Sequence, residues 1–158
     1  MFDDVIARYA SQFQVPEVWI KAVIQTESAF NPQAYRAEPQ INDASYGLMQ
    51  LLHKTARGLG YTGAVNGLYD VDTNIRLGTQ LLAELTGRFG DDFRRVYSAY
   101  NSGNPDKWET STQVRTNVER ALRNLESYIR EEPLVVTGGV AGGLMILALM
   151  WYWGQRKK

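Results

Sequence analysis

The sequence predicts a mainly α-helical domain with a small β-hairpin, followed by one C-terminal transmembrane helix. Several segments of the first 130 residues repeat apolar side chains at intervals of three and four, the spacing of a helix with one buried face. Residues 134–153 are twenty residues without a charge, long enough for a helix to span the ~30 Å hydrocarbon core of a bilayer. We therefore expect a domain over residues 1–130, a linker over 131–133, a membrane helix over 134–153 and a basic tail over 154–158.

The first two helices are expected over residues 3–13 and 16–29. The first has apolar side chains at helical spacing, namely Val5, Ile6, Tyr9 and Phe13. Pro16 suits the first turn of the second helix, because its missing N–H would have no partner there. Asn31-Pro32 ends that helix, since the residue before a proline is disfavoured in helical geometry. The polar stretch over residues 31–43 has no sustained period and is predicted to be a loop.

The middle of the chain is expected to supply the small β-hairpin. An apolar run over residues 48–52 precedes a short helical piece and a glycine-rich turn. Three longer helices follow, over residues 74–89, 94–100 and 112–130. Asp70 or Asp72 can cap the first of these helices.

Composition narrows the function classes. Basic and acidic residues number 17 each, so the charge balance gives no support for nucleic-acid binding. The chain has no cysteine, which excludes disulfides and thiolate chemistry. The amino terminus carries acids where a secretory signal would be positive, so we expect no cleavable signal peptide.

Glu27 is the candidate for acid–base chemistry. Ile20, Val23 and Ile24 lie on one face of the second helix, and Glu27 continues that apolar stripe. A carboxyl group removed from water has a raised pKa, which a general acid working near neutral pH requires. The alternative is a glutamate at a helix end that turns aside to solvent or to an arginine, and the stripe alone leaves both interpretations open.

Several short motifs carry a family resemblance. In chain order they are Glu27-Ser28 with Asn31-Pro32, then Gly47-Leu48-Met49-Gln50, then Asn74-Ile75, then Ala99-Tyr100-Asn101-Ser102-Gly103. Each motif is weak alone, but their order and separations are specific. Over roughly residues 1–130 the chain resembles the catalytic domain of the soluble lytic transglycosylases, a lysozyme-like family.

The resemblance implies a function and a set of site residues. Glu27 would be the single catalytic residue, protonating the glycosidic oxygen of peptidoglycan and then acting as base. The sugar's own hydroxyl would capture the anomeric carbon, which gives a 1,6-anhydromuramoyl end without the usual second carboxylate. No cofactor is expected. Substrate contacts are expected from Ser45, Met49, Gln50, Tyr100 and Asn101, with the Tyr100 hydroxyl reaching toward the catalytic carboxyl.

The residues themselves leave some of these roles open. Amide, phenol and thioether groups suit the hydroxyl edges and apolar faces of sugars. Met49 and Tyr100 could equally be buried core residues, and Asn101 could belong to a plain turn. Gly47 is expected to serve the backbone.

The chain also departs from the family pattern. Residues 35–44 form a longer and more charged segment than usual, and Arg36 stands where a serine is often found, so contacts in this segment cannot be transferred. A second carboxylate would favour hydrolysis by water. By position the candidates are Asp43, Asp70 and Asp72, of which we favour capping for the last two and leave Asp43 open.

A metal site is not expected. The sequence has one histidine, His53, without His, Cys or acidic residues at metal-ligand spacing. It is predicted to lie on the surface.

The charge-free segment predicts a membrane location. Trp151, Tyr152 and Trp153 suit an interfacial aromatic belt, and the basic tail that follows should stay in the cytoplasm, with the domain on the side of the cell wall. Gly138 with Gly142, and Gly139 with Gly143, would permit close self-association of two such helices, although glycine is also tolerated in an ordinary span. The expected partners are therefore the lipid bilayer, through residues 134–153, and peptidoglycan strands.

Three functions compete at this point. The first is a lytic transglycosylase, which the small size, absent signal and tail anchor suggest travels with a bacteriophage virion and opens the wall during entry. A lysis or secretion-system enzyme with unusual export is the rival origin. The second function is a hydrolytic muramidase assisted by Asp43 or another acid. The third is a structural membrane or virion protein that grips glycan without cutting it.

Overall fold

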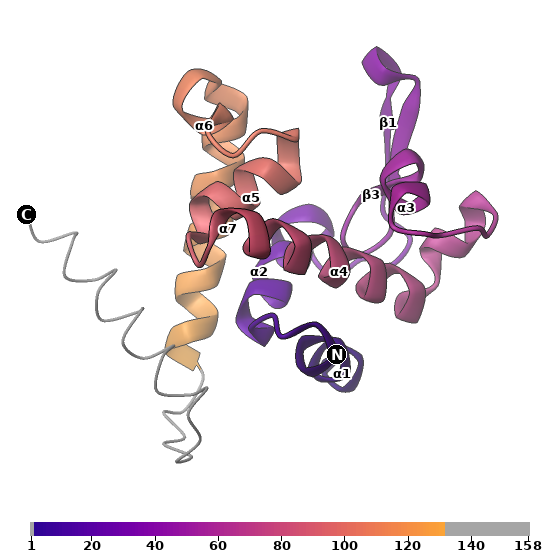
Figure 1. The fold of residues 1–158 in the computed structure, drawn as a ribbon, viewed down its shortest axis with the longest axis horizontal. Coiled ribbons are helices and arrows are strands. Elements are labelled where there is room, and N and C mark those ends of the chain that lie inside the picture. The colour runs from indigo at the N-terminus through magenta and orange to yellow at the C-terminus, as the bar shows by residue number, and fades with distance from the viewer. Residues whose placement is uncertain (1, 132–158) are drawn as a thin grey trace, which may run out of the picture.

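The computed structural model describes residues 2–131, which form a helical body with a small sheet at one side (Figure 1). The helices are α1 (Asp3–Phe13), α2 (Glu17–Ser28), α3 (His53–Gly58), α4 (Val71–Phe89), α5 (Phe93–Ser102), α6 (Lys107–Thr110) and α7 (Thr112–Glu131). The strands are β1 (Tyr35–Glu38), β2 (Asp43–Tyr46) and β3 (Leu51–Leu52), and the short 3-10 turns are η1 (Pro39–Ile41) and η2 (Val65–Tyr69).

Helix α2 runs through the centre of the body. It packs against α7 and α1, and most of its side chains are buried. Ile20, Val23 and Ile24 have no exposed surface, as the apolar stripe predicts. Trp19 meets the edge of the Phe93 ring at 5.0 Å, which joins α2 to α5. The end of α2 is thus fixed by packing from several sides.

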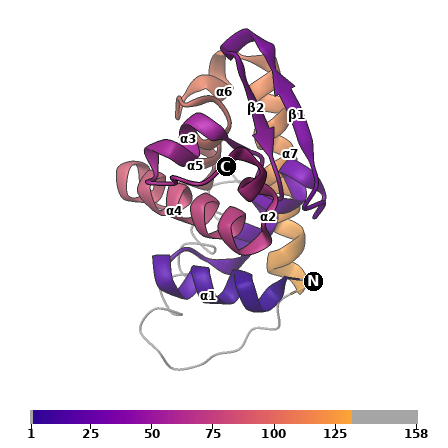
Figure 2. The same ribbon diagram turned by 90° about the vertical axis from the view of Figure 1, so that its right-hand side faces the viewer.

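The β-hairpin lies earlier in the chain than predicted. Strand β1 lies in the segment that was expected to be loop, and β2 begins at the last residue of that segment. The two strands pair antiparallel, with Arg36 opposite Ser45 and Glu38 opposite Asp43. Only residues 51–52 of the apolar run form a strand, β3, which completes the order β1-β2-β3. The β1 strand has no buried residue, so its sequence lacks the alternation of apolar and polar residues that predicts a strand. Figure 2 shows the hairpin standing out from the helices.

Helix ends follow the predicted chemistry with small shifts. Helix α4 begins at Val71, earlier than expected, and the Asp70 carboxylate caps it by accepting from the Thr73 N–H at 2.9 Å. Helix α5 continues through Asn101 and Ser102 and ends where Gly103 adopts φ 76°. Asn101 and Ser102, which follow the helix predicted over residues 94–100, therefore belong to its last turn.

The predicted linker from residue 132, membrane helix, glycine pairs and basic tail lie outside the described residues. Within residues 2–131, no helix is both long and apolar enough to cross a membrane. The predicted mainly helical class with a small sheet is confirmed for this part of the chain.

Candidate active site

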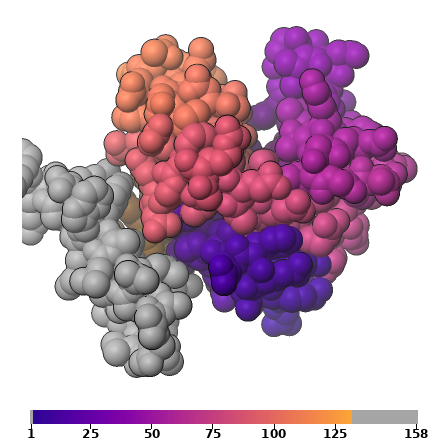
Figure 3. Space-filling view, in the orientation of Figure 1, coloured from indigo at the N-terminus to yellow at the C-terminus, as the bar shows by residue number. Residues whose placement is uncertain are grey.

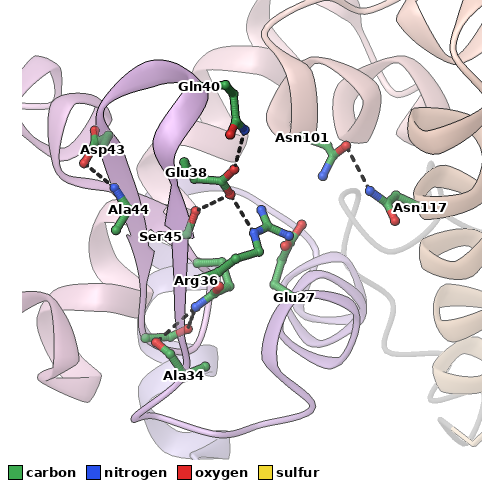
Figure 4. A network of polar contacts seen from close by, with 12 residues as sticks. Glu27, Ala34, Arg36, Glu38, Gln40, Asp43, Ala44, Ser45, Asn101 and Asn117 are labelled. Atoms are coloured by element: carbon green, nitrogen blue, oxygen red, sulfur yellow. Dashed lines mark hydrogen bonds and ion pairs between the residues drawn. The ribbon is translucent and has the colours of Figure 1, made fainter.

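The cleft is the hollow between the hairpin, residues 35–46, and the lobe formed by α5 and α6, which Figure 3 shows as a notch in the surface. Glu27 lies in the last turn of α2, at the floor of this region. In Figure 4 its carboxyl group lies between hairpin side chains on one side and Asn101 on the other. The geometry therefore places an acid where a substrate strand could reach it.

The end of α2 is anchored to the next motif. The Ser28 hydroxyl donates to the main-chain oxygen of Leu48 at 2.7 Å. Ala29 and Phe30, which follow, both adopt left-handed backbone conformations, with φ 51° and 62°. Such conformations are unfavourable for residues with a side chain, so the surrounding packing must hold this turn. The motif that begins with Glu27 thus has a structural task beside its chemistry.

The carboxyl group of Glu27 has a perturbed environment. Its burial raises the pKa above the ordinary value for glutamate, against the hydrogen bond from Tyr97 and the charges of Arg36 and Arg120, which lower it. The charge of Glu38 raises the pKa further. The net effect is a raised pKa, which favours the protonated form of Glu27, as the apolar stripe predicted.

The tyrosine that donates to Glu27 is Tyr97, not Tyr100. The Tyr97 hydroxyl donates to Glu27 Oε1 at 2.7 Å, whereas the Tyr100 hydroxyl donates to the main-chain oxygen of Met49 at 2.7 Å. Burial raises the pKa of both phenols well above 10, so both stay protonated donors. Tyr97 was not predicted, because it lies just before the motif Ala99-Tyr100-Asn101-Ser102-Gly103 that carries the family resemblance. Tyr97 lies one turn after Phe93 on the buried face of α5, and that spacing was the available signal.

Gly47 fulfils the expected backbone role. Its φ is 73°, and a Cβ atom there would lie 2.5 Å from Asn74 Nδ2 and 2.6 Å from the main-chain oxygen of Leu68. Asn74 is fully buried, accepts from the Met49 N–H at 2.8 Å and donates to the main-chain oxygens of Tyr46 and Leu68. One amide side chain therefore fixes the shape of the segment from β2 to Met49.

Met49 belongs to the core. It has no exposed surface, and its sulfur lies where a Cβ on Gly78 of α4 would be. The side chain therefore packs against α4, which agrees with the core alternative that the sequence left open. Its main-chain oxygen accepts a hydrogen bond from the Tyr100 hydroxyl, and this bond connects Met49 to α5.

The other predicted contact residues are held by the protein itself. Gln50 is half-buried and donates from Nε2 to the main-chain oxygens of Ala34 and Gly47, each at 3.1 Å. Asn101 is half-buried and accepts from Asn117 Nδ2 at 3.3 Å. Ser45 is 2% exposed and donates to Glu38. Ser45 and Asn101 lie on opposite sides of Glu27 (Figure 4).

The three aspartates considered as a second carboxylate have structural partners. Asp70 caps α4, and Asp72 pairs with Arg8 at 2.7 Å while accepting from the Tyr9 hydroxyl. Asp43 accepts from the main-chain N–H groups of Ala44 and Lys54, at 2.7 and 3.1 Å. It therefore secures the start of α3 to the hairpin.

A different acid, Glu38, lies on the hairpin near Glu27 (Figure 4). Its side chain is only 14% exposed and accepts from Arg36 Nε at 2.6 Å, from Gln40 at 2.8 Å and from Ser45 at 3.3 Å. Glu38 was not predicted at the site, because its segment was predicted to be a loop, in which the side chains of residues 36 and 38 need not point the same way. In a strand they share one face, and that face turns to Glu27 (Figure 4).

His53 is not the surface residue that was predicted. It is half-buried at the start of α3, and its Nε2 atom is buried without a hydrogen-bond partner. Among residues 2–131, no group of three or more His, Cys, Asp or Glu side chains could hold a metal ion.

Comparisons with known proteins agree with this geometry. A family model described as the transglycosylase SLT domain matches residues 4–123. The transglycosylase of Enterobacteria phage PRD1 is 31% identical over 134 residues, which cover 85% of this chain and 46% of that protein. The soluble lytic murein transglycosylase of Escherichia coli K12 is 31% identical over 110 residues, which cover 65% of this chain and 16% of that protein.

Solved structures give the same relationship. The lytic transglycosylase Slt of Pseudomonas aeruginosa, in an inactive mutant form, matches with a TM-score of 0.71 at 25% identity, covering 81% of this chain and 24% of that one. The chain thus spans less than half the length of these relatives. Because the family model covers most of the described residues, the chain belongs to the transglycosylase SLT domain family.

Proposed function

We propose that this protein cleaves the β-1,4 glycosidic bond between N-acetylmuramic acid and N-acetylglucosamine in peptidoglycan, with Glu27 as the only catalytic carboxyl group. The observation that carries the proposal is the Glu27 carboxyl at the cleft, with burial raising its pKa and Tyr97 fixing its orientation. The relative named as a soluble lytic murein transglycosylase supports the choice of substrate.

The first step requires protonated Glu27. Its proton passes to the glycosidic oxygen as the bond from that oxygen to the anomeric carbon breaks, and positive charge develops on the muramoyl ring. Glu27 is left as a carboxylate beside that charge. The Tyr97 hydroxyl, which stays protonated, keeps donating to the carboxylate and stabilises it.

In the second step we propose that the muramoyl ring closes on itself. The C6 hydroxyl oxygen bonds to the anomeric carbon, and its proton returns to Glu27, which restores the acid and leaves a 1,6-anhydro end. The aspartates considered for a water-activating role are engaged in capping and pairing, which supports the internal nucleophile. The inactive mutant of the P. aeruginosa relative replaces one glutamate by glutamine, in keeping with a single acid.

Roles in substrate binding are proposed for Ser45, Gln50, Tyr100 and Asn101, by direct contact for the two amides and through neighbouring residues for Ser45 and Tyr100. Gln50 and Asn101 are half-buried amides whose remaining hydrogen-bonding groups suit sugar hydroxyls. Tyr100 would act mainly by holding the Met49 main chain in place. Ser45 would act through Glu38, to which it donates.

The products test this proposal. Purified peptidoglycan is digested with the wild type, with Glu27→Gln and with Glu17→Gln, a control at the exposed start of the same helix. Mass spectrometry should find anhydromuramoyl ends with the wild type and the control, and none with Glu27→Gln. Reducing ends from the wild type would instead establish a hydrolytic muramidase. Equal cleavage by Glu27→Gln would remove Glu27 from the mechanism.

We further propose, on sequence alone, that residues 134–153 anchor the domain to a membrane and that the protein serves wall opening by a bacteriophage. The charge-free segment and the basic tail support the anchor, and the similarity to the phage PRD1 transglycosylase supports the setting. Alkaline carbonate extraction of membranes should leave the full chain in the pellet and release a variant with three leucines replaced by aspartates in that segment. Release of both would contradict the anchor.

A further inference from the structure

The hairpin presents a charged pair to the catalytic acid. Arg36 and Glu38 lie two residues apart on β1, so their side chains share one face of the strand. Arg36 Nε donates to Glu38 Oε1 at 2.6 Å, and one edge of the guanidinium group turns toward the Glu27 carboxyl (Figure 4). The pair lies in the segment where the chain departs from its family pattern, which leaves its role unassigned.

The pair is built to hold its position. The Glu38 side chain is 14% exposed, whereas that of Arg36 is 55% exposed. Gln40, which follows β1, and Ser45, opposite Arg36 on β2, both donate to the same Glu38 carboxylate. Three donors hold the Glu38 carboxylate in place, and the long, exposed Arg36 side chain gains its order from that fixed partner.

We propose that Arg36 and Glu38 are positioning residues for Glu27, in which Glu38 anchors the Arg36 guanidinium beside the cleft and the two opposite charges together set how readily Glu27 gives and regains its proton. This role rests on the proposed function of Glu27 as acid and base. In this proposal both residues act through Glu27.

The remaining groups around Glu27 define the setting. Tyr97 and Tyr100 face it from α5 as neutral phenols, and Arg120 faces it from α7. The positive charge of Arg36 lowers the pKa of Glu27, whereas the negative charge of Glu38 raises it. Because Glu27 must hold a proton to start the reaction, activity falls as pH rises through this pKa. Removing the Arg36 charge should therefore move the alkaline limb of the pH profile to higher pH, and removing the Glu38 charge should move it to lower pH.

The test is a direct titration of Glu27 in the full chain, kept in an uncharged detergent. The carboxyl 13C signal of Glu27 is assigned by its absence from Glu27→Gln and followed by NMR against pH. Arg36→Gln should raise the midpoint, and Arg36→Lys, which keeps the charge, should return it toward the wild type. Glu38→Gln should lower the midpoint, because glutamine still accepts from Arg36 but has no charge.

Two further variants complete the design. Glu38→Ala removes the anchor as well as the charge, so its midpoint should lie above that of Glu38→Gln. Arg95→Gln breaks an exposed pair between Arg95 on α5 and Asp106, which precedes α6, and should leave the midpoint unchanged. Midpoints that do not move, or that move in one direction for both charges, would overturn the electrostatic role, and equal midpoints for Glu38→Ala and Glu38→Gln would overturn the anchoring role.

Activity is a second, separate readout. The pH at which the initial rate of glycan release falls should be higher in Arg36→Gln, and lower in Glu38→Gln, than in the wild type. If the wild type releases no glycan, the proposed function fails, while the NMR titration still decides whether Arg36 and Glu38 act on Glu27.

Discussion

Helix α2 and the β1–β2 hairpin both present an acidic side chain to the same cleft, but different forces hold them there. The helix is surrounded by α1, α5 and α7, and its apolar residues near Glu27 have no exposed surface. The hairpin projects from the body, has no buried residue on β1 and exposes Tyr35 and Ile41. Packing thus fixes the acid, whereas main-chain pairing and polar contacts fix the charges that act on it.

The largest effect expected from this difference is on stability. Ile24→Ala removes a fully buried side chain from α2 and should cost about 2–5 kcal/mol of the free energy of unfolding. Ile41→Ala, at a position that is 55% exposed in η1, should change it by less than about 0.5 kcal/mol. Urea unfolding measures both, and similar losses would mean that the hairpin carries more of the packing than its exposure indicates.

Gly47, where β2 leads into the helical body, should be the most sensitive position between the two regions. Gly47→Ala places a Cβ against Asn74 and the Leu68 main chain at a left-handed backbone conformation, and a cost of about 1–3 kcal/mol follows. Gly60→Ala has a similar φ, 87°, with no atom within 4 Å of the added Cβ, so it reports the backbone strain alone. Equal costs for the two variants would show that the Asn74 contact is unimportant.

Tyr97→Phe separates orientation from packing at the acid. The ring stays in its stack, but Glu27 loses its hydrogen bond, so the pKa of Glu27 should rise further and the alkaline limb of activity should move to higher pH. The rate at the optimum should fall by roughly tenfold, since the loss of one such hydrogen bond costs about 1–2 kcal/mol. Tyr100→Phe provides the contrast, because its hydroxyl donates to Met49, and its pH profile should keep the wild-type midpoint.

The smallest expected effect is the contribution of the Glu27 proton to the free energy of unfolding. A pKa raised by folding means that the folded state binds the proton more tightly, so this contribution is present at low pH and is lost as pH rises through the folded pKa. Glu27→Gln, which resembles the protonated form, should therefore be more stable than the wild type at pH 8 and nearly equal at pH 4. Urea midpoints at the two pH values check this, and a Glu27→Gln variant that is less stable at pH 8 would contradict burial as the dominant cause.

The sequence predicted the helices well because their apolar stripes encode burial directly. Glu27 emerged from the same signal, as an acid at the end of a stripe that proves to be fully buried. Asp70 could be assigned from capping chemistry alone. These features depend on neighbours within one or two helical turns.

The hairpin and the Tyr97 contact could not be predicted in the same way. Strand β1 buries nothing, so its pairing leaves no periodic trace, and the relation between Arg36, Glu38 and Glu27 exists only after β1 pairs with β2. Tyr97 and Glu27 are 70 residues apart, and their contact follows from how α5 packs beside α2. For Met49 the sequence left both the cleft and the core open, and the packing of its side chain against Gly78 could be seen only in the fold.

The central claim is that Glu27 alone supplies the proton. The most direct measurement is the initial rate of glycan release from purified peptidoglycan by the wild type, Glu27→Gln, Glu38→Gln and Glu17→Gln, each followed over the same range of pH. Loss of the general acid should reduce the rate roughly 10²–10⁴-fold in Glu27→Gln alone. Glu38→Gln should retain most of the activity at its own pH optimum. A Glu27→Gln variant within a few-fold of the wild type, or a loss in Glu38→Gln as large as that in Glu27→Gln, would contradict the account.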